Sequence, residues 1–169
     1  GEKLISHYTY CLCGDGCLQE GVSQEAISIA GLNKLNKLIL IYDDNAVTLD
    51  GPTSLSNADN VKNRFLASNW NVIEINNGDD LFALDNAFNR AKKSKDKPTL
   101  IWMKTIIGYG SIKQGTNKTH GAPLGVEDGN HAKKDIYGFD HEEFYIHTFR
   151  HTRIRLPALF FLRHKELKR

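Results

Sequence analysis

Short apolar runs alternate with amphipathic segments along most of this chain. Some runs are rich in apolar and β-branched residues and are bounded by polar turns, a pattern typical of strands. They predict strands at Tyr8–Cys13, Leu38–Tyr42, Val72–Ile75 and Thr99–Thr105. Between these runs the apolar residues recur every three or four positions, as on one face of a helix. This spacing predicts helices at Leu18–Leu32, from a cap at Asn57 or Asp59 to Ser68, and at Leu81–Ala91.

The same spacing predicts which face of two helices is buried. In the first helix, the apolar positions that share a face are Val22, Ala26, Ile29 and Ala30. In the last helix, they are Leu81, Leu84, Ala87, Phe88 and Ala91. The run Leu38–Tyr42 is apolar throughout, so this strand is expected to be covered on both of its sides.

The predicted elements alternate strictly between strand and helix. Strands joined through helices form right-handed βαβ units, so the expected fold class is α/β, with a parallel sheet and helices on both faces. Ligands of such sheets bind beyond the carboxyl ends of the strands. Three segments follow predicted strands and are therefore the places to look for chemistry: Gly14–Gly21, Asp43–Gly51 and Ile106–Gly125.

The first of these segments holds an acid between two glycines, Gly14-Asp15-Gly16. It is not the dinucleotide fingerprint, because Gln19 occupies the position of the third glycine, and it lacks the lysine of a Walker loop. The glycines allow a phosphate to approach the backbone closely. A carboxylate repels a diphosphate directly but can hold it through a hard divalent cation, and Mg²⁺ takes carboxylate and phosphate oxygens as ligands.

The second segment offers partners for that cation. Asn45 follows the next strand, 30 positions after Asp15, which is about one βαβ repeat. Two adjacent strand ends would place these side chains close together. Asn45 has an oxygen for a cation and an amide donor for a phosphate, and the backbone carbonyl of Val47 could complete the protein ligands. A calcium-loop interpretation fails, because Val47 and Thr48 stand where a third ligand and a glycine are needed.

These loops and two later strings resemble the transketolase family in order and spacing. The strings are Gly14–Gly21 (GDGCLQEG), Tyr42–Asn45 (YDDN), Lys104–Ser111 (KTIIGYGS) and His120–Gly125 (HGAPLG). The resemblance implies a thiamine-diphosphate-binding fold, incomplete in this chain, with a partial domain over residues 1–147 and a basic tail over residues 148–169. One departure is Asn117, where the family pattern often has a histidine, and it bears on the expected substrate contacts.

By this resemblance, the cofactor is thiamine diphosphate, held through Mg²⁺ or Ca²⁺. The implied metal ligands are Asp15, Asn45 and the carbonyl of Val47. The implied cofactor contacts are Gly16 and Asn45 for the diphosphate, with Ile107 and Leu49 near the rings. His120 is the catalytic candidate, because it would lie beside cofactor and substrate, able to donate a hydrogen bond to developing charge or to move a proton. Glu20 would lie at a subunit interface.

The resemblance also implies an activity and an assembly. The activity is transfer of a two-carbon ketol group from a ketose phosphate to an aldose phosphate, in a cytoplasmic homodimer. The chain is expected to begin near the middle of the first of three domains. The glutamate that activates the cofactor belongs to the second domain and has no counterpart here. We therefore expect the isolated chain to have little or no activity.

Two other interpretations stay open. The chain could belong to another thiamine-diphosphate enzyme, such as a dihydroxyacetone synthase or a transketolase-like subunit that needs a separate chain carrying the missing domain. It could also be a non-catalytic product of a broken gene, or a regulatory module that binds a partner. Cofactor binding, and ketol transfer after mixing with a candidate partner chain, would separate these classes.

Charge and cysteine content limit the partners. The net charge of +2 does not favour a nucleic-acid binder, and no apolar run is long enough to span a membrane. Residues 148–169 carry seven Lys or Arg against one acid, so the preceding domain is mildly acidic. Cys11, Cys13 and Cys17 fit neither a disulfide framework nor paired zinc knuckles, which predicts three reduced, mostly buried thiols.

Overall fold

The computed structural model describes residues 6–139 and 141. The strands and helices of these residues are, in order, β1 (Thr9–Gly14), α1 (Asp15–Gln19), α2 (Gly21–Leu32), β2 (Leu38–Asp44), β3 (Val47–Thr48), β4 (Gly51–Pro52), α3 (Val61–Ala67), β5 (Asn71–Ile75), α4 (Leu81–Ala91), β6 (Thr99–Lys104) and α5 (Val126–Asn130). Shorter helical turns are η1 (Thr53–Leu55), η2 (Asn117–Thr119) and η3 (His131–Ile136). The predicted basic tail at residues 148–169 lies outside the described residues.

The longer strands form one parallel sheet in the order β1-β2-β6-β5. Parallel neighbours cannot be joined by a tight hairpin, so each connection crosses over through a helix or a long loop. β3 and β4 form a separate antiparallel pair beyond the end of β2. The predicted strand Leu38–Tyr42 continues to Asp44, because both added residues pair with β6.

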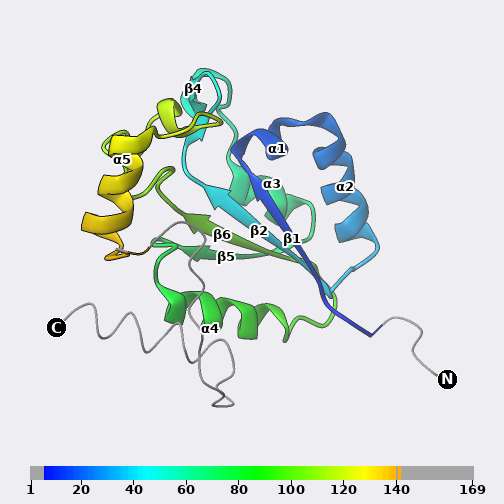
Figure 1. Ribbon diagram of the computed structural model, residues 1–169. Coiled ribbons are helices and arrows are strands. Elements are labelled where there is room, and N and C mark those ends of the chain that lie inside the picture. Colours follow the sequence, from blue (N-terminus) through cyan, green and yellow to red (C-terminus); the bar gives the residue numbers. More distant parts are fainter. Residues whose placement is uncertain (1–5, 140, 142–169) are drawn as a thin grey trace, which may run out of the picture.

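Helices cover both faces of the sheet, which confirms the predicted α/β class (Figure 1). On one face, α1, α2 and α3 pack on a core that includes Leu18, Ile27, Phe65, Trp70 and Leu100. On the other face, α4 packs on a core made of Ile39, Ile73, Ile75, Ala87, Ala91 and Ile101. Side chains alternate along a strand, so β2 sends Ile39 to the α4 side and Leu40 to the α2 side.

The helix predicted at Leu18–Leu32 is two helices. The chain breaks at Glu20, whose backbone is extended (φ −70°, ψ 136°). α1 is too short to satisfy its own last carbonyls, so they need other partners. Gln24 of α2 reaches back to supply one, donating through Nε2 to the carbonyl of Leu18 at 2.5 Å. The break places a sharp corner directly after the first glycine-rich loop.

The predicted buried face of α2 is wrong except at Ala30. Val22 and Ile29 have 69% and 58% of their surface exposed, and Ala26 is exposed too. The buried residues are instead Ile27, Ala30 and Gly31. The small residues decide the orientation, because α2 approaches the backbone beyond α3 too closely for a larger side chain at Gly31. Hydrophobic spacing alone does not contain that information.

The predicted face of α4 is confirmed at four of its five positions. Ala87 and Ala91 are buried, while Leu84 and Phe88 pack against the same core. Leu81, at the start of the helix, is half-buried and is not part of that core. Asp80 caps this helix, because its side chain accepts hydrogen bonds from the backbone amides of the first turn.

The predicted cap of α3 is wrong. Neither Asn57 nor Asp59 caps the helix; Asn60 does, with its Oδ1 accepting from the amide of Asn63 at 3.0 Å. Asn57 instead forms the preceding turn, where its Oδ1 accepts from the amide of Asp59 at 2.8 Å. All three residues are good capping types, so only the path of the loop selects the third.

The expectation of mostly buried cysteines is also wrong. All three thiols are free, but Cys11 and Cys17 are exposed and only Cys13 is buried. Cys11 lies in β1, an edge strand of the described sheet whose first four residues are exposed, and Cys17 lies in α1. Burial raises the pKa of the Cys13 thiol to about 12, with nearby thiols and carboxylates acting in the same direction.

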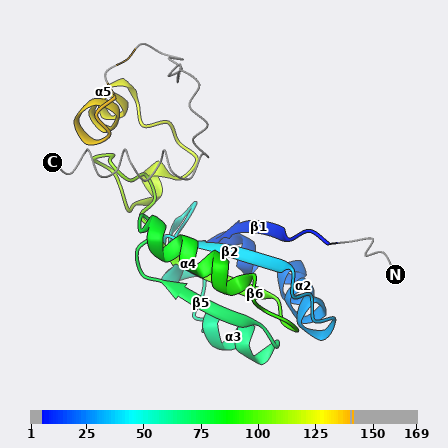
Figure 2. The ribbon, with the colours of Figure 1, turned by 90° about the horizontal axis from the view of Figure 1, so that it is seen from below.

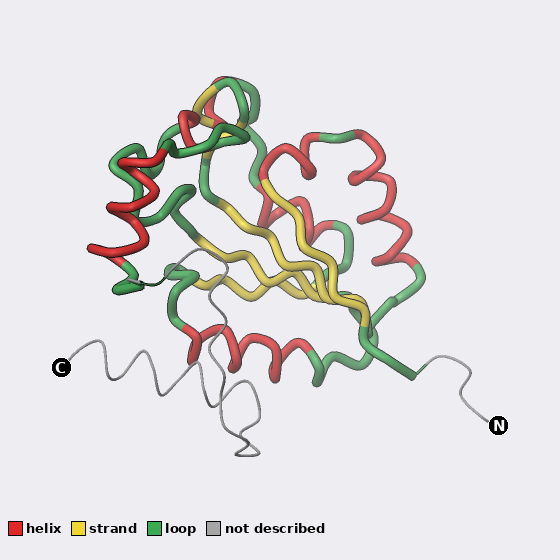
Figure 3. The backbone as a smooth tube through the Cα atoms, in the orientation of Figure 1, coloured by secondary structure: helices red, strands yellow, loops and turns green. Residues whose placement is uncertain are grey.

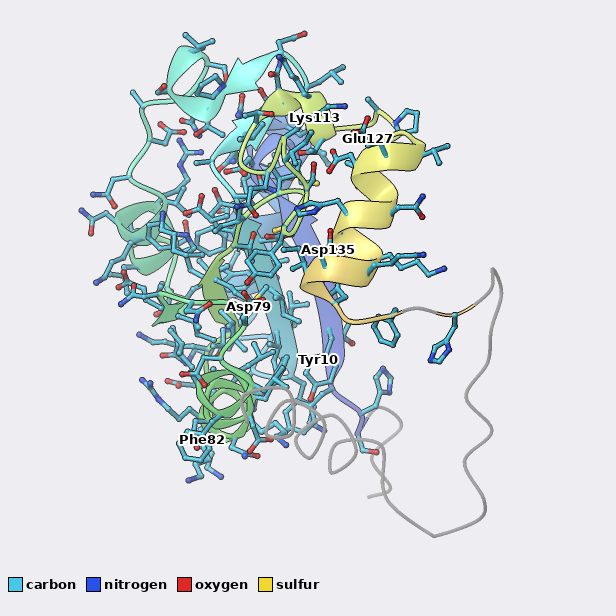
Figure 4. All side chains as sticks on the ribbon, turned by 60° about the vertical axis from the view of Figure 1, so that its left-hand side comes forward. Tyr10, Asp79, Phe82, Lys113, Glu127 and Asp135 are labelled. Carbon is cyan, nitrogen blue, oxygen red and sulfur yellow. The ribbon has the colours of Figure 1, made fainter. Side chains whose placement is uncertain are left out.

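The segment after β6 is a long loop that ends in α5. Figure 3 shows the loops after β2 and β6 at the same end of the sheet, and Figure 2 shows α5 standing off beyond that end. Glu127, labelled in Figure 4, lies on α5. Asp128 of α5 holds the loop: its carboxylate accepts from Ser111 Oγ at 2.6 Å and from the amide of Ile112 at 2.9 Å. Within the described residues, no helix combines the length and apolar character that a membrane span requires.

Candidate metal and diphosphate site

The register of β1 and β2 sets the position of Asp15. These strands pair in parallel up to Gly14 and Asp43, so the turns that follow them emerge side by side. Asp15 is the first residue of α1 and is buried, with 6% of its surface exposed. A carboxylate here lies at the carboxyl ends of two adjacent strands, where α/β sheets bind their ligands.

Asp15 has one satisfied oxygen and one unsatisfied oxygen. Its Oδ1 accepts a hydrogen bond from Tyr42 Oη at 2.6 Å, whereas its Oδ2 is buried without a partner. Burial raises the pKa of this carboxyl, and the hydrogen bond from Tyr42 and the nearby backbone of Asn45 act in the opposite direction. A buried, partly unpartnered carboxylate is stabilised by a bound cation.

The turn after β2 brings Asn45 and Val47 to the same end of the sheet. Asn45 Oδ1 accepts from the amide of Val47 at 3.0 Å, forming a tight turn. Ala46, between them, has a left-handed backbone (φ 60°). That conformation costs a non-glycine residue about 1–2 kcal/mol. The carbonyl of Ala46 accepts from the amide of Thr53 at 3.0 Å, which holds the strained turn in place.

His120 follows η2 in the long loop after β6. The residue is half-buried, and its Nδ1 is fully buried without a hydrogen-bond partner. The loop touches the β2 turn at Leu49, whose carbonyl accepts from Asn117 Nδ2 at 3.5 Å and whose Cδ1 would lie 3.9 Å from a Cβ on Gly121. Leu49 itself is 63% exposed.

Two side-chain atoms in the described part of the chain are buried without any hydrogen-bond partner: Asp15 Oδ2 and His120 Nδ1. Buried polar atoms in folded proteins almost always have partners, and an exception calls for an explanation such as a missing ion or ligand. Both exceptions belong to residues that the sequence singled out. One is an acceptor suited to a cation, and the other is a ring nitrogen suited to a ligand or a proton.

The remaining predicted residues differ in their surroundings. Gly16 is exposed, and a Cβ added there would meet nothing within 4 Å, so the space beside its backbone is open. Ile107 is half-buried, and its carbonyl accepts from the amide of Gly115 at 2.8 Å. Glu20 is exposed at the corner between α1 and α2. Its side chain makes no ion pair with any residue that the structure describes.

The predicted metal site uses a single carboxylate. Across residues 6–139 and 141, no three His, Cys, Asp or Glu side chains are grouped as metal ligands. A cation at Asp15 would therefore take its other protein oxygens from an amide side chain and a carbonyl, and the rest from phosphate or water. This mixture is typical of Mg²⁺ bound together with a phosphate ligand.

Sequence reasoning missed two residues next to Asp15. Tyr42 is the partner of its carboxylate, and Asp44 is a buried acid that accepts from Trp102 Nε1 at 2.6 Å and forms an ion pair with Lys104. Tyr42 could have been found, because a hydroxyl at the end of a buried apolar strand needs a hydrogen-bond partner. The Asp44 contacts depend on β6 lying beside β2, which the sequence does not state.

A cavity of about 450 Å³ opens behind Asp15, on the same face of the sheet as α3. Its walls include Tyr42, Asp44, Trp102 and Lys104, together with the segment from Asn57 to Val61. Asn45, Val47 and His120 do not line it. This cavity therefore shares Asp15 with the candidate site, whereas the predicted diphosphate contacts Gly16 and Asn45 are not among its lining residues.

Comparison with known proteins defines the class. A family model described as "Transketolase, thiamine diphosphate binding domain" matches residues 1–153. The domain is thus a thiamine-diphosphate-binding α/β domain, and thiamine diphosphate binding is the property that membership implies. The chain belongs to the transketolase family.

Individual relatives agree with this assignment. A probable transketolase of Schizosaccharomyces pombe is 52% identical over 141 residues, which is 83% of this chain and 20% of that protein. The transketolase structure from Leishmania mexicana superimposes with a TM-score of 0.82 at 43% identity, over 96% of this chain and 24% of that one. A Pichia stipitis transketolase mutant in complex with xylulose 5-phosphate gives a TM-score of 0.80 at 41% identity, over 82% of this chain and 21% of that one. The chain spans about a fifth of the length of the curated relatives.

Proposed function

We propose that this chain supplies the metal- and diphosphate-binding part of a transketolase. The reaction would move a two-carbon ketol group from a ketose phosphate to an aldose phosphate. The observation that carries the proposal is the pair of buried, unpartnered atoms, Asp15 Oδ2 at the start of α1 and His120 Nδ1 directly after η2. Family membership and the sugar phosphate bound to the Pichia stipitis relative support the same reaction class.

The proposed cation ligands are Asp15, Asn45 and the carbonyl of Val47, with Mg²⁺ or Ca²⁺ as the ion. The residues present fit such an ion, because Asp15 offers a buried oxygen with no other partner. Asn45 Oδ1 accepts one hydrogen bond, from the backbone amide of Val47. A side-chain carbonyl oxygen has two lone pairs, so one remains for a cation. Gly16 and Asn45 would contact the diphosphate, and the open space beside Gly16 supports that role.

Around the cofactor, Leu49 and Ile107 would provide apolar contacts and His120 the acid–base group. Bound thiamine diphosphate supplies the electron sink for ketol transfer. His120 can donate a hydrogen bond or exchange a proton, depending on which ring nitrogen carries hydrogen. Its buried Nδ1 makes it sensitive to any polar group placed beside it.

The wider assembly is also part of the proposal. The parent enzyme would be a cytoplasmic homodimer with Glu20 at the subunit interface, acting on sugar phosphates. The carboxylate that activates the cofactor would come from a domain outside this chain, either in the same polypeptide or in a separate partner chain. Residues 1–147 would form the partial cofactor domain, and the chain alone would have little or no transferase activity.

Calorimetric titration with thiamine diphosphate, with and without Mg²⁺, tests the site. We expect weak binding that requires the metal and that is lost in Asp15→Ala and Asn45→Ala. Asp85→Ala is the matched control, because Asp85 lies on α4, on the opposite face of the sheet, and bonds only to Asn89 among the described side chains. Metal-independent binding, or unchanged binding in both site variants, would refute the assignment.

Ketol transfer tests the parent activity. The purified chain should show no turnover alone, and turnover should appear only when a chain carrying the remaining domains is added. Turnover by the isolated chain would contradict the proposal that an essential carboxylate is absent.

A further inference from the structure

Tyr42 is held in one orientation by the sheet and by its neighbours. It lies near the end of the central strand β2, paired with Cys13 of β1 and with Trp102 of β6, and only 5% of its surface is exposed. Its ring stacks on Trp102, with centroids 6.1 Å apart and planes 23° apart. The Trp102 indole is fixed in turn, because its Nε1 donates to Asp44 Oδ2 at 2.6 Å.

The Tyr42 hydroxyl reaches Asp15, the first residue of α1. Asp15 directly follows Gly14, the last residue of β1 that pairs with β2, and Tyr42 pairs one position earlier with Cys13. Tyr42 Oη donates to Asp15 Oδ1 at 2.6 Å, a short distance typical of a hydrogen bond to a carboxylate. A hydroxyl has one hydrogen to donate, so this bond occupies one carboxylate oxygen and leaves Oδ2 free.

We propose that Tyr42 is the positioning residue of the cation site, fixing Asp15 so that Oδ2 faces the metal. This inference rests on the proposed function, because it takes Asp15 as a metal ligand. Groups behind a ligand orient it, and their removal typically weakens metal affinity by about 10- to 100-fold. In this role Tyr42 acts through its hydrogen bond to Asp15 and not as a metal ligand itself.

A purely structural role for the tyrosine predicts a different result. In that case, loss of the hydroxyl would lower the stability of the metal-free fold and leave the affinity of the folded chain for metal unchanged. Tyr42→Phe keeps the ring and its stacking on Trp102, so it removes the hydrogen bond with little change of packing. Tyr8→Phe is a matched control, because Tyr8 Oη also donates one hydrogen bond, to the carbonyl of Lys92 at 2.8 Å. Tyr8 directly precedes β1 and so lies at the end of that strand remote from Asp15.

The experiment uses the full chain with Mn²⁺ as the probe and thiamine diphosphate present. Electron paramagnetic resonance of free Mn²⁺ gives the dissociation constant, and urea unfolding in EDTA gives the metal-free stability. We expect Tyr42→Phe to raise the Mn²⁺ dissociation constant about 10- to 100-fold. Tyr8→Phe should leave that constant at the unaltered value, and both variants should unfold in EDTA at similar urea concentrations.

Asp15→Asn distinguishes a failure of the Tyr42 positioning role from a failure of the proposed metal site. If Asp15→Asn loses Mn²⁺ while Tyr42→Phe binds it as tightly as the unaltered chain, the positioning role is wrong and the metal site stands. If Asp15→Asn also binds Mn²⁺ normally, the proposed function itself fails. A Tyr42→Phe variant that loses stability but keeps its Mn²⁺ affinity once folded would assign the tyrosine a structural role only.

Discussion

Gly31 of α2 lies against the backbone of Ser68, the residue that follows α3. A Cβ added to Gly31 would stand 1.8 Å from the carbonyl oxygen of Ser68 and 3.5 Å from the Trp70 ring. The same region is tied by Trp70 Nε1, which donates to the carbonyl of Ile27 at 2.9 Å. Only glycine permits α2 to lie this close to the backbone of Ser68. The glycine therefore fixes how α2 packs on the sheet.

Gly31→Ala should therefore destabilise the domain. Alanine improves helix propensity by about 1 kcal/mol, but overpacking costs about 1–3 kcal/mol, and contact with a backbone atom cannot be relieved by a rotamer change. We expect a lower urea midpoint. Gly21→Ala, in the same helix but with nothing within 4 Å of the added carbon, should match or slightly exceed the unaltered chain. Equal midpoints for the two variants would contradict this packing argument.

Asp15→Asn should cost binding but not stability. Burial raises the pKa of Asp15 in the folded chain, so its ionised form is disfavoured there. The carboxyl contributes stability below its unfolded-state pKa, and this contribution is lost as pH rises through the folded-state pKa. Asparagine keeps an oxygen for Tyr42 and carries no charge. At neutral pH in EDTA, we expect a thermal midpoint at or above that of the unaltered chain, with no added stability from Mg²⁺ and thiamine diphosphate.

A clearly lower midpoint of Asp15→Asn in EDTA would show that the charge itself supports the fold. The pH series provides a second check. The unaltered chain should lose stability relative to Asp15→Asn as pH rises from acid to neutral, and parallel curves would rule out a raised folded-state pKa.

The three thiols should differ in reactivity. Cys11 and Cys17 are exposed, whereas Cys13 is buried with its pKa raised to about 12. The thiolate is the reactive form, so a disulfide reagent in mildly alkaline buffer should modify two thiols quickly and the third only after unfolding. Cys13→Ala should retain both fast thiols and lack the slow one. Three equally fast thiols would mean that β1 opens readily.

The same shift predicts a loss of stability in alkali. The folded-state pKa of Cys13 lies above 9.0, the ordinary value of a cysteine thiol. The contribution of this thiol is therefore complete below about pH 9 and declines as pH rises toward about 12. Cys13→Ala should show a smaller decline in its unfolding midpoint over that interval.

Asp128 should stay ionised in mild acid and so keep its hydrogen bonds to Ser111 and Ile112 in the loop after β6. The hydrogen bond from Ser111 lowers the pKa of Asp128, and the Ile112 amide and nearby positive charges act in the same direction. Its contribution to stability is present above the unfolded-state pKa and is lost as pH falls through the lower folded-state value. The amide proton shift of Ile112, followed by nuclear magnetic resonance, should titrate below the ordinary range of an aspartate. Asp128→Asn should abolish that titration. A midpoint in the ordinary pKa range of aspartate in the unaltered chain would refute the proposed role of Asp128 in holding the loop.

Local patterns in the sequence were enough for the four strands of the parallel sheet, most of the α4 face and the α/β class, but not for the short strands β3 and β4. Apolar runs and helical spacing arise from burial on a sheet or along a helix, so they predict these elements without knowledge of the segments that pack against them. The resemblance of the glycine-rich and histidine strings to transketolase pointed to the family that the comparisons then supported.

Tertiary structure decided what depends on segments remote in sequence. The buried face of α2 differs from the predicted one because Gly31 packs against the backbone of Ser68. The extended backbone at Glu20 divides into two helices a segment whose hydrophobic spacing predicts one. The strand order placed β6 beside β2, which gave Asp44 its indole and lysine partners. Whether an atom is buried without a partner is a property of all its neighbours together, so no pattern along the chain could mark Asp15 Oδ2 and His120 Nδ1 in this way.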